Sequence, residues 1–342
     1  DETFEAYPAL DTPSGERHPD LYREIVAQAA PGDLVVVAVP DNLHDEMIRF
    51  ALEHDQHVLT VKPLVQTAEQ GRRIAEIARE RGLFVGVEYH KRFDRRALES
   101  RHLYRAGRFG EFRLGEAKMI EAYGYRHSNF QNWFTPDVSD PFTYVGCHYV
   151  DLVHFITGLE PVEVSVRGVL GRFPNGNEGY MWATGRVVWE NDAILTVSDG
   201  LGYPDRAAGT NDQGLIMYCE GDDTAAVIRH DDQYRGVEYG YIDDSSGAHF
   251  KYINPDYFRL VPWHGQGLRP VGYGYDSVEA LVESAIRVRD AGDIQQRRAT
   301  IEEIDRQGLI ATPTNSEFNE RVTEAARKSI AENGTPVVLE TK

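Results

Sequence analysis

A polar stripe on one predicted helix could transfer a proton. Residues 145–157 are expected to be helical, which places Tyr144, His148 and Asp151 along one face, toward a shared cleft. His148 is the candidate general base, because imidazole titrates near neutral pH and can accept and return a proton. The alternative is that His148 and Asp151 only hydrogen-bond each other or a backbone carbonyl. For an isolated histidine on a helix, that alternative is favoured.

A lysine follows a buried strand, at the edge where ligands of parallel sheets bind. Lys62 comes directly after residues 56–61, which read as such a strand. Its ammonium could hydrogen-bond a reacting hydroxyl and stabilise negative charge that develops on the oxygen. A cis peptide bond before Pro63 would fix the direction of the Lys62 carbonyl. The alternative is a solvated lysine without a chemical role.

The first third of the chain alternates buried strands with amphipathic helices. Three β-branched runs predict strands covered on both faces: residues 33–40 (DLVVVAVP), 56–61 (QHVLTV) and 83–88 (LFVGVE). The helix before the first run is expected to end at Gly32. The third helix should begin with a capping box of Thr67 and Gln70 and stop at Gly82. This alternation is half of a doubly wound parallel sheet.

The remainder of the chain predicts one large, mainly antiparallel sheet. Its β-rich runs follow a helix near residues 95–106 and cover residues 112–122, 162–173, 184–189, 193–198, 215–220 and 225–230. A last helix is expected over residues 316–332. We therefore predict an α/β fold in two domains. The first, residues 1–92, carries the parallel sheet, and the second, residues 93–342, is an α+β domain with an open sheet.

Composition excludes several classes of partner. The chain has 342 residues with 36 Lys and Arg against 55 Asp and Glu, a formal charge of -19 that repels nucleic acid and anionic membranes. Cys147 and Cys219 lie far apart without metal-type spacing, so we predict no metal site and no disulfide framework. A reducing, cytoplasmic compartment fits best. No apolar run approaches the roughly 20 residues that cross a bilayer, and no signal-peptide pattern opens the chain.

Five segments spread along the chain form a recognisable series: residues 33–44 (DLVVVAVPDNLH), 61–63 (VKP), 86–93 (GVEYHKRF), 146–151 (GCHYVD) and 311–330. In their residues and their order, these segments resemble the motifs of the Gfo/Idh/MocA oxidoreductases, over nearly the whole length of the chain. The resemblance implies a Rossmann domain, here partial, followed by an open-sheet domain for substrate binding and oligomerisation. It also implies NAD or NADP as cofactor, and it favours His148 as a base over the purely structural alternative.

The resemblance assigns roles to individual residues. It implies catalytic roles for Lys62 and His148, to which we add Tyr144. Cofactor contacts are expected from Pro40, Asn42, His44, Lys62, Pro63 and Arg92. Substrate contacts are expected from Tyr123, Tyr125, His127, Trp133 and Asp151. Polar and aromatic clusters of this kind bind sugars through ring faces and hydroxyl contacts.

The chain departs from the family pattern in its nucleotide loop. No G-x-G-x-x-G occurs, and by strand counting residues 3–7 would be the third Rossmann strand. We therefore expect two strands and the glycine loop upstream of Asp1. If the 342 residues are the whole protein, the pyrophosphate has no helix N-terminus to bind and tight dinucleotide binding is not expected.

Two substitutions affect the chemistry. Val61 stands where the family usually has Glu, and Tyr144 stands where it usually has the Asp four residues before His148. We hypothesise that the Lys62 ammonium lowers the pKa of the Tyr144 phenol, which would then share or replace the base role. The alternative is a tyrosine that only lines the pocket.

Three functions remain open at this stage. The leading one is an NAD(P)-dependent dehydrogenase acting on a secondary alcohol of a sugar, polyol or glycoside. The second is an NAD-assisted glycoside hydrolase of the same family, and the third is a non-catalytic member that has lost its nucleotide loop. We expect a carbohydrate or polyol substrate and a homo-oligomer packed through the open sheet, whose broad face needs cover. Sheet packing or a subunit interface is expected of Trp182, Trp189, Tyr203, Tyr257, Phe258 and Trp263.

Overall fold

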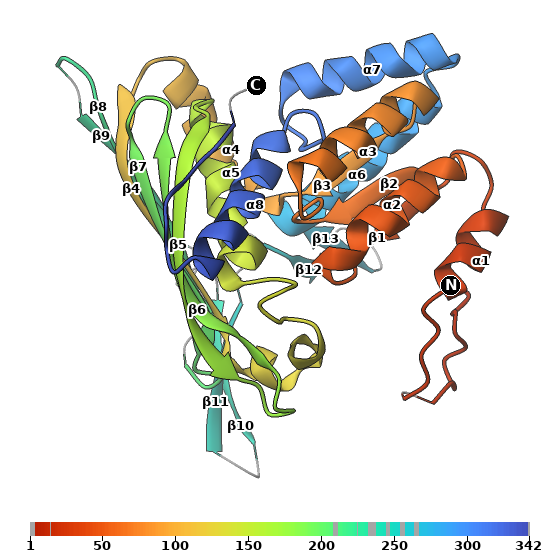
Figure 1. Cartoon of the computed structure of the whole chain (residues 1–342), viewed down its shortest axis with the longest axis horizontal. Coiled ribbons are helices and arrows are strands. Elements are labelled where there is room, and N and C mark those ends of the chain that lie inside the picture. The colour runs from red at the N-terminus through yellow and green to blue at the C-terminus, as the bar shows by residue number, and fades with distance from the viewer. Residues whose placement is uncertain are drawn as a thin grey trace.

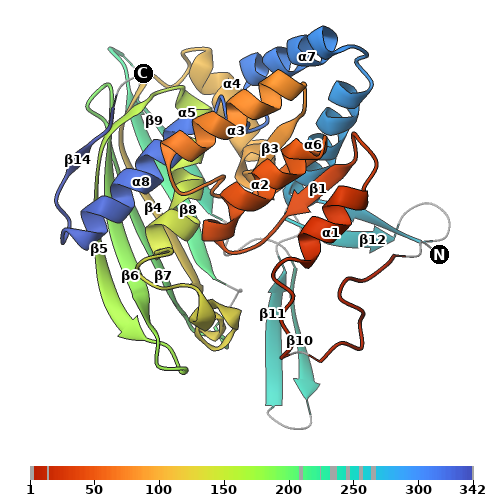
Figure 2. The same ribbon diagram turned by 45° about the vertical axis from the view of Figure 1, so that its right-hand side comes forward.

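Two sheets with helices between and around them make up the molecule (Figure 1). The computed structural model describes residues 4–13, 15–207, 211–223, 225–231, 237–243, 247–253, 257–262 and 267–340. One sheet has three strands and the other has seven. Two hairpins accompany them. One pairs β10 (Val237–Asp243) with β11 (Gly247–Ile253), as Figure 2 shows, and the other pairs β12 (Arg259–Pro262) with β13 (Leu268–Val271).

The three-stranded sheet is parallel, as the buried β-branched runs predict. Its order is β1 (Leu34–Val37), β2 (His57–Val61) and β3 (Val85–Glu88). The helices of this part are α1 (Leu21–Gln28), α2 (His44–Glu53) and α3 (Ala68–Arg81). Ile48 of α2 and Ile74 of α3 are fully buried in one core with Val58 and Val85, so these two helices cover one face of the sheet.

The other face is covered by helices from much later in the chain. Helices α6 (Tyr273–Arg289) and α7 (Ile294–Gln307) bring Leu281 and Ile304 into a core with Leu59 and Phe84. Gly86 of β3 makes this contact possible, because a Cβ there would lie 2.3 Å from the Leu281 side chain. Two helices from the predicted second domain thus cover one face of the parallel sheet of the first domain.

The seven-stranded sheet is mainly antiparallel, and only β4 and β7 run parallel to each other. Its order is β14 (Val337–Val338), β5 (Pro161–Arg172), β6 (Glu178–Trp189), β7 (Ile194–Tyr203), β4 (Glu111–Ala122), β8 (Asp212–Glu220) and β9 (Ala225–Asp231). Helices α4 (Arg95–Arg105), α5 (Cys147–Thr157) and α8 (Glu317–Ala331) lie between the two sheets (Figure 1). The α/β fold class predicted from the sequence is confirmed.

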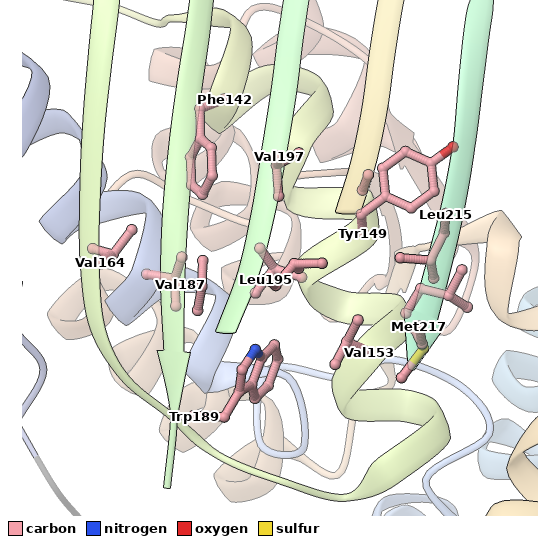
Figure 3. Packing of buried hydrophobic residues seen from close by; sticks show 14 of the residues in the cluster. Phe142, Tyr149, Val153, Val164, Val187, Trp189, Leu195, Val197, Leu215 and Met217 are labelled. Carbon is pink, nitrogen blue, oxygen red and sulfur yellow. The ribbon is translucent and has the colours of Figure 1, made fainter. Parts of the chain in front are cut away.

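The inner face of this sheet packs on α5 and α8. Figure 3 shows Trp189, Leu195 and Val197 of the sheet facing Tyr149 and Val153 of α5. These side chains are at most 3% exposed, and burying such a side chain contributes about 1.5–3 kcal/mol. This core therefore holds α5, and with it His148, in a fixed position against the sheet.

Most predicted helix boundaries are confirmed, and two local predictions are wrong. Thr67 and Gln70 form the capping box, and Gly82 ends α3 in the left-handed conformation. Helix α1, however, ends with Ala29 as its cap, and Gly32 (φ 87°) lies in the turn before β1. Residues 4–7 form no strand, while Thr3 lies outside the described residues.

A buried carboxyl on α8 should make stability depend on pH. Glu320 is fully buried and burial raises its pKa from 4.5 to about 8. Between these values the unfolded chain loses the proton while the folded chain keeps it, so this group's contribution to stability falls as pH rises. Glu320→Gln cannot ionise. From pH 5.5 to 7, we expect its free energy of unfolding to rise by about 2 kcal/mol relative to wild type.

Urea unfolding at the two pH values measures this difference. Glu332→Gln, which removes an exposed carboxylate at the end of the same helix, is the control and should show no such drift. A Glu320→Gln difference that stays constant with pH would show that Glu320 is already ionised in the folded protein.

Candidate active site

The carboxyl ends of the parallel strands form the floor of the site. The Lys62–Pro63 peptide bond after β2 is cis, as the sequence suggested. His44 is fully buried, with Nδ1 at 2.8 Å from the Pro63 carbonyl oxygen and Nε2 at 2.9 Å from that of Val39. His44 thus ties the loop after β1 to the loop after β2. Both ring nitrogens of this predicted cofactor contact are thus within hydrogen-bond distance of main-chain carbonyl oxygens.

The loop after β1 also joins the second domain. Pro40 is half-buried and Asn42 is exposed, so both can still meet a ligand. Between them, Asp41 is buried and accepts a 2.6 Å hydrogen bond from the Ser139 hydroxyl. Burial raises the pKa of Asp41, and the nearby Lys62 charge opposes that rise.

Lys62 reaches across the domain boundary to Tyr144. Its Nζ lies 3.7 Å from the centroid of the Tyr144 ring and donates a hydrogen bond to the Tyr144 carbonyl oxygen. That carbonyl belongs to a π-helical turn, Phe142–Gly146, which leads directly into α5. The ammonium is therefore held at the start of the helix that carries His148.

His148 is the second residue of α5 and is 2% exposed. Its ring centroid is 4.6 Å from that of His90 and 5.9 Å from that of Tyr89. Burial, followed by the positive charges of His90, Lys62 and Lys91, lowers the pKa of His148 well below 6.5. The ring is therefore neutral at physiological pH. Its buried Nδ1 has no hydrogen-bond partner in the part of the chain that the structure describes.

The hypothesis of an acidic Tyr144 phenol is wrong. Burial, together with the negative charges of Asp41 and Glu121, raises the pKa of Tyr144 above its usual value of 10. The Lys62 ammonium contacts the face of the ring and the main-chain carbonyl oxygen. Tyr144 thus supports the lysine through a cation–π contact.

This contact predicts the behaviour of two variants. Tyr144→Phe keeps the ring and removes a phenol that stays protonated, so kcat/KM and its pH profile should stay within about threefold of wild type. Tyr144→Leu removes the ring and should lower kcat/KM by about tenfold. Steady-state rates from pH 5 to 10 test both. A limb of the pH profile that disappears in Tyr144→Phe would restore the phenol to the base role.

Arg92 and Asp151 form a buried ion pair behind the site. Arg92 donates from Nε at 2.7 Å and from Nη2 at 2.5 Å to the two oxygens of Asp151, and Asn319 of α8 adds a bond at 2.9 Å. Arg92 is 2% exposed and Asp151 1%. The predicted cofactor contact Arg92 and the predicted substrate contact Asp151 are thus buried against each other, and they join α5 to the end of the parallel sheet and to α8.

The predicted substrate-binding aromatics divide into two groups. Trp133 lies 5.7 Å from Tyr144, and Tyr125 joins the same cluster through Phe130, which is 4.8 Å from Tyr125 and 5.1 Å from Tyr144. Burial raises the pKa of Tyr125 to about 12, so its hydroxyl stays protonated. Tyr123 and His127 are exposed and contact each other at 5.6 Å. The structure thus brings Tyr125 and Trp133 to the lysine end of the site.

Several site residues were missed by sequence reasoning. His90 lies 5.4 Å from Tyr257 and 5.8 Å from Tyr273, and its Nδ1 is 3.1 Å from Glu88. His90 stands in the quoted segment GVEYHKRF, so a signal existed. Tyr257 was expected in packing or an interface, and its ring lies 5.4 Å from those of His90 and Tyr273. Trp189 is a core residue as expected, while Trp263 lies outside the described residues.

Family models match both parts of the chain. "Oxidoreductase family, NAD-binding Rossmann fold" matches residues 5–89, and "GFO/IDH/MocA C-terminal domain" matches residues 97–221. The chain belongs to the Gfo/Idh/MocA family of oxidoreductases. The expectation from the sequence motifs is confirmed.

Curated relatives match the chain over part of their length. Inositol 2-dehydrogenase 1 of Saccharopolyspora erythraea is 32% identical over 153 residues, which are 42% of this chain and 43% of the relative. D-glucoside 3-dehydrogenase of Escherichia coli is 30% identical over 140 residues, 40% of this chain and 38% of the relative. The matched segment thus spans less than half of each relative.

Solved structures share the fold. An inositol dehydrogenase homologue from Azotobacter vinelandii, complexed with NADH and myo-inositol, has a TM-score of 0.63 at 20% identity and covers 93% of this chain and 81% of its own. Scyllo-inositol dehydrogenase from Lactobacillus casei, with bound NAD(H) and scyllo-inositol, has a TM-score of 0.61 at 14% identity and covers 93% and 83%. At these identities the likeness establishes the architecture alone.

The residues present fit the nicotinamide end of a dinucleotide. Pro40, Asn42, Lys62 and Pro63 line the carboxyl edge of β1 and β2, where ligands of such sheets bind, and a buried His148 nitrogen without a partner lies near them. No glycine-rich phosphate loop occurs within residues 1–342. Over the described residues, no group of three or more His, Cys, Asp or Glu could hold a metal ion, and no helix is long and apolar enough to span a membrane.

Proposed function

We propose that the protein is an NAD(P)-dependent dehydrogenase that oxidises or reduces a secondary alcohol of a sugar, polyol or glycoside. One observation carries the proposal: the Lys62 ammonium is held by Tyr144 at the start of α5, and its charge acts on the His148 imidazole in the first turn of that helix. An ammonium and a neutral imidazole are the pair that alcohol oxidation needs, one to stabilise the alkoxide and one to accept the proton.

The chemistry divides between the cofactor and the chain. The nicotinamide, when bound, accepts the hydride from the alcohol carbon. Lys62 donates a hydrogen bond to the alcohol oxygen and stabilises the charge that develops as the proton leaves. His148 accepts this proton, since its lowered pKa keeps it neutral and ready.

The substrate class follows from the walls of the site. Trp133 and Tyr125 offer ring faces, and neutral sugars and polyols stack on such surfaces. The net charge of -19 disfavours phosphorylated sugars. The dehydrogenases named above act on inositols and on a glucoside, so we propose a neutral polyol or glycoside for this chain.

Spectrophotometry of the purified protein tests the proposal. Wild type is mixed with NAD⁺ or NADP⁺ and, in turn, myo-inositol, scyllo-inositol, methyl β-D-glucoside and D-glucose, and absorbance at about 340 nm is followed. We expect reduction of the cofactor with at least one of these alcohols. Comparison of the rates with NAD⁺ and NADP⁺ shows which dinucleotide the protein prefers. Tight binding of the dinucleotide without turnover of any of these alcohols would favour the second candidate below.

The second candidate is an NAD-assisted glycoside hydrolase. Tyr144 supports it, because the tyrosine stands where dehydrogenases of the family usually carry Asp, and its raised pKa removes it as a substitute base. Such an enzyme would release the aglycone from a nitrophenyl glucoside with no net cofactor reduction. Accumulation of NADH without release of the aglycone would instead support the dehydrogenase.

The open sheet supports a homo-oligomer within the same proposal. Large apolar side chains are exposed on the sheet and its rims, including Leu114, Val169, Trp182, Tyr218 and Val227. A second copy would cover such a face. Sedimentation of the protein at micromolar concentration measures its molecular mass. We expect a mass larger than that of a monomer, and a monomer would contradict the proposal. A cytoplasmic location fits the free thiols of Cys147 and Cys219.

A further inference from the structure

The seven-stranded sheet contributes a carboxyl group, that of Glu121, which no sequence motif predicted as a site residue. Glu121 is the last inward-facing residue of β4, after Ala117 and Met119 on the same face. It pairs in register with Leu201 of β7 and is 8% exposed. The end of β4 therefore delivers a nearly buried carboxyl to the space between the sheet and the catalytic pair.

The surroundings of Glu121 are those of the site itself. Burial raises the pKa of Glu121, and the hydrogen bond from Asn211 and the charges of Lys62, Lys91 and His90 oppose that rise and favour the ionised carboxylate. Its negative charge in turn acts on Tyr125, Tyr144 and Tyr257. The carboxylate thus lies among the groups that surround the Lys62 ammonium, on the sheet side.

A series of side-chain hydrogen bonds that runs from Lys91 through Gln213 and Asn211 determines that Glu121 accepts a hydrogen bond. The Lys91 ammonium can only donate, and it donates to Gln213 Oε1 at 2.7 Å. The amide nitrogen of Gln213 must then point onward, and it donates to Asn211 Oδ1 at 3.1 Å. This leaves Asn211 Nδ2 to face Glu121, at 3.5 and 3.4 Å from its two oxygens. Glu121 is therefore held as an acceptor.

The acceptor capacity of Glu121 is largely unused. A carboxylate can accept about four hydrogen bonds. Among the described residues, Asn211 is the single hydrogen-bond partner of Glu121, at long distances. A buried carboxylate with few donors is costly, so a ligand that brings hydroxyl groups would be favoured here.

We propose that Glu121 is a substrate-binding residue that accepts a hydrogen bond from the hydroxyl vicinal to the one that reacts at Lys62. The inference deepens the proposed function and rests on it. Glu121 supplies from the sheet the carboxylate that the helix lacks at Tyr144. It also narrows the substrate class to alcohols with a free neighbouring hydroxyl, since an analogue without that hydroxyl would leave the buried carboxylate unpaired.

Binding without cofactor gives the first test. Titration calorimetry measures the affinity of myo-inositol and methyl β-D-glucoside for wild type, Glu121→Gln and Glu116→Gln. Glu116 lies on the same strand but is exposed on the outer face, so its variant is the matched control. We expect about 10- to 100-fold weaker binding for Glu121→Gln and no change for Glu116→Gln. Melting temperatures confirm that all three proteins are folded.

Kinetics with deoxy analogues give the second test. For an alcohol that wild type oxidises, removing the vicinal hydroxyl should lower kcat/KM about 10- to 100-fold in wild type and have little further effect in Glu121→Gln. Equal losses in both proteins, or equal affinity of wild type and Glu121→Gln in the calorimeter, would overturn the inference. Binding that depends on Glu121 without any oxidation would overturn the proposed function alone. No binding of either probe by wild type would overturn both.

Discussion

Replacing Lys62 by methionine should lower kcat by about a thousandfold in the dehydrogenase assay. Lys62 reaches the start of α5, where its Nζ is fixed by the Tyr144 ring and carbonyl. Methionine keeps an unbranched apolar stem but cannot stabilise the alkoxide. The loss should therefore appear mainly in kcat, because the interaction strengthens as charge develops in the transition state.

The control for this variant is another lysine. Lys118→Met removes an exposed ammonium on β4 that pairs with Asp212, and it should leave kcat unchanged. Lys62→Met must also unfold cooperatively at a temperature close to that of wild type. If folded Lys62→Met retained more than about a tenth of the wild-type kcat, the proposed role of the ammonium would have to be abandoned.

The elements that position Lys62 could be predicted because each carries a strong local signal. β2 reads as a buried strand in any context, and Thr67, Gln70 and Gly82 mark the ends of α3 by hydrogen-bonding and φ requirements that are local. Spacing alone put Tyr144, His148 and Asp151 on one side of a helix. The convergence of Lys62 and His148, however, rested on the family resemblance, because no local pattern encodes contact between residues 86 positions apart.

The remaining site residues depend on tertiary contacts. The π-helical turn turns the Tyr144 carbonyl toward Lys62, and nothing in the residue types of that turn requires it. Glu121 reads as an ordinary position in a strand of alternating burial, since only the fold shows which strand end meets the cleft. The sequences of helices α6 and α7 have weak hydrophobic periodicity. These helices pack on β2 and β3, which lie roughly 200 residues earlier in the sequence.

Asp151 also could not be placed from local sequence. Its position on the helix predicts a carboxylate that faces the cleft, but in the structure it pairs with Arg92, which lies 59 positions earlier. An ion pair this buried is costly to break, since the remaining charge has no solvent to replace its partner. Asp151→Ala should therefore destabilise the protein by about 3–5 kcal/mol, measured as a lower midpoint of guanidinium unfolding.

Two further variants test this explanation. The double variant Arg92→Met with Asp151→Leu leaves no unpaired charge and should recover most of the stability that Asp151→Ala loses. The control Glu163→Ala breaks the exposed ion pair with Arg186 and should lower the free energy of unfolding by at most about 1 kcal/mol. A double variant as unstable as Asp151→Ala would mean that α5 needs the pair itself, through its bond to Asn319, and not merely the absence of an unpaired charge. In that case the ion pair would be the element that fixes His148 against α8, and its loss would reduce kcat as well as stability.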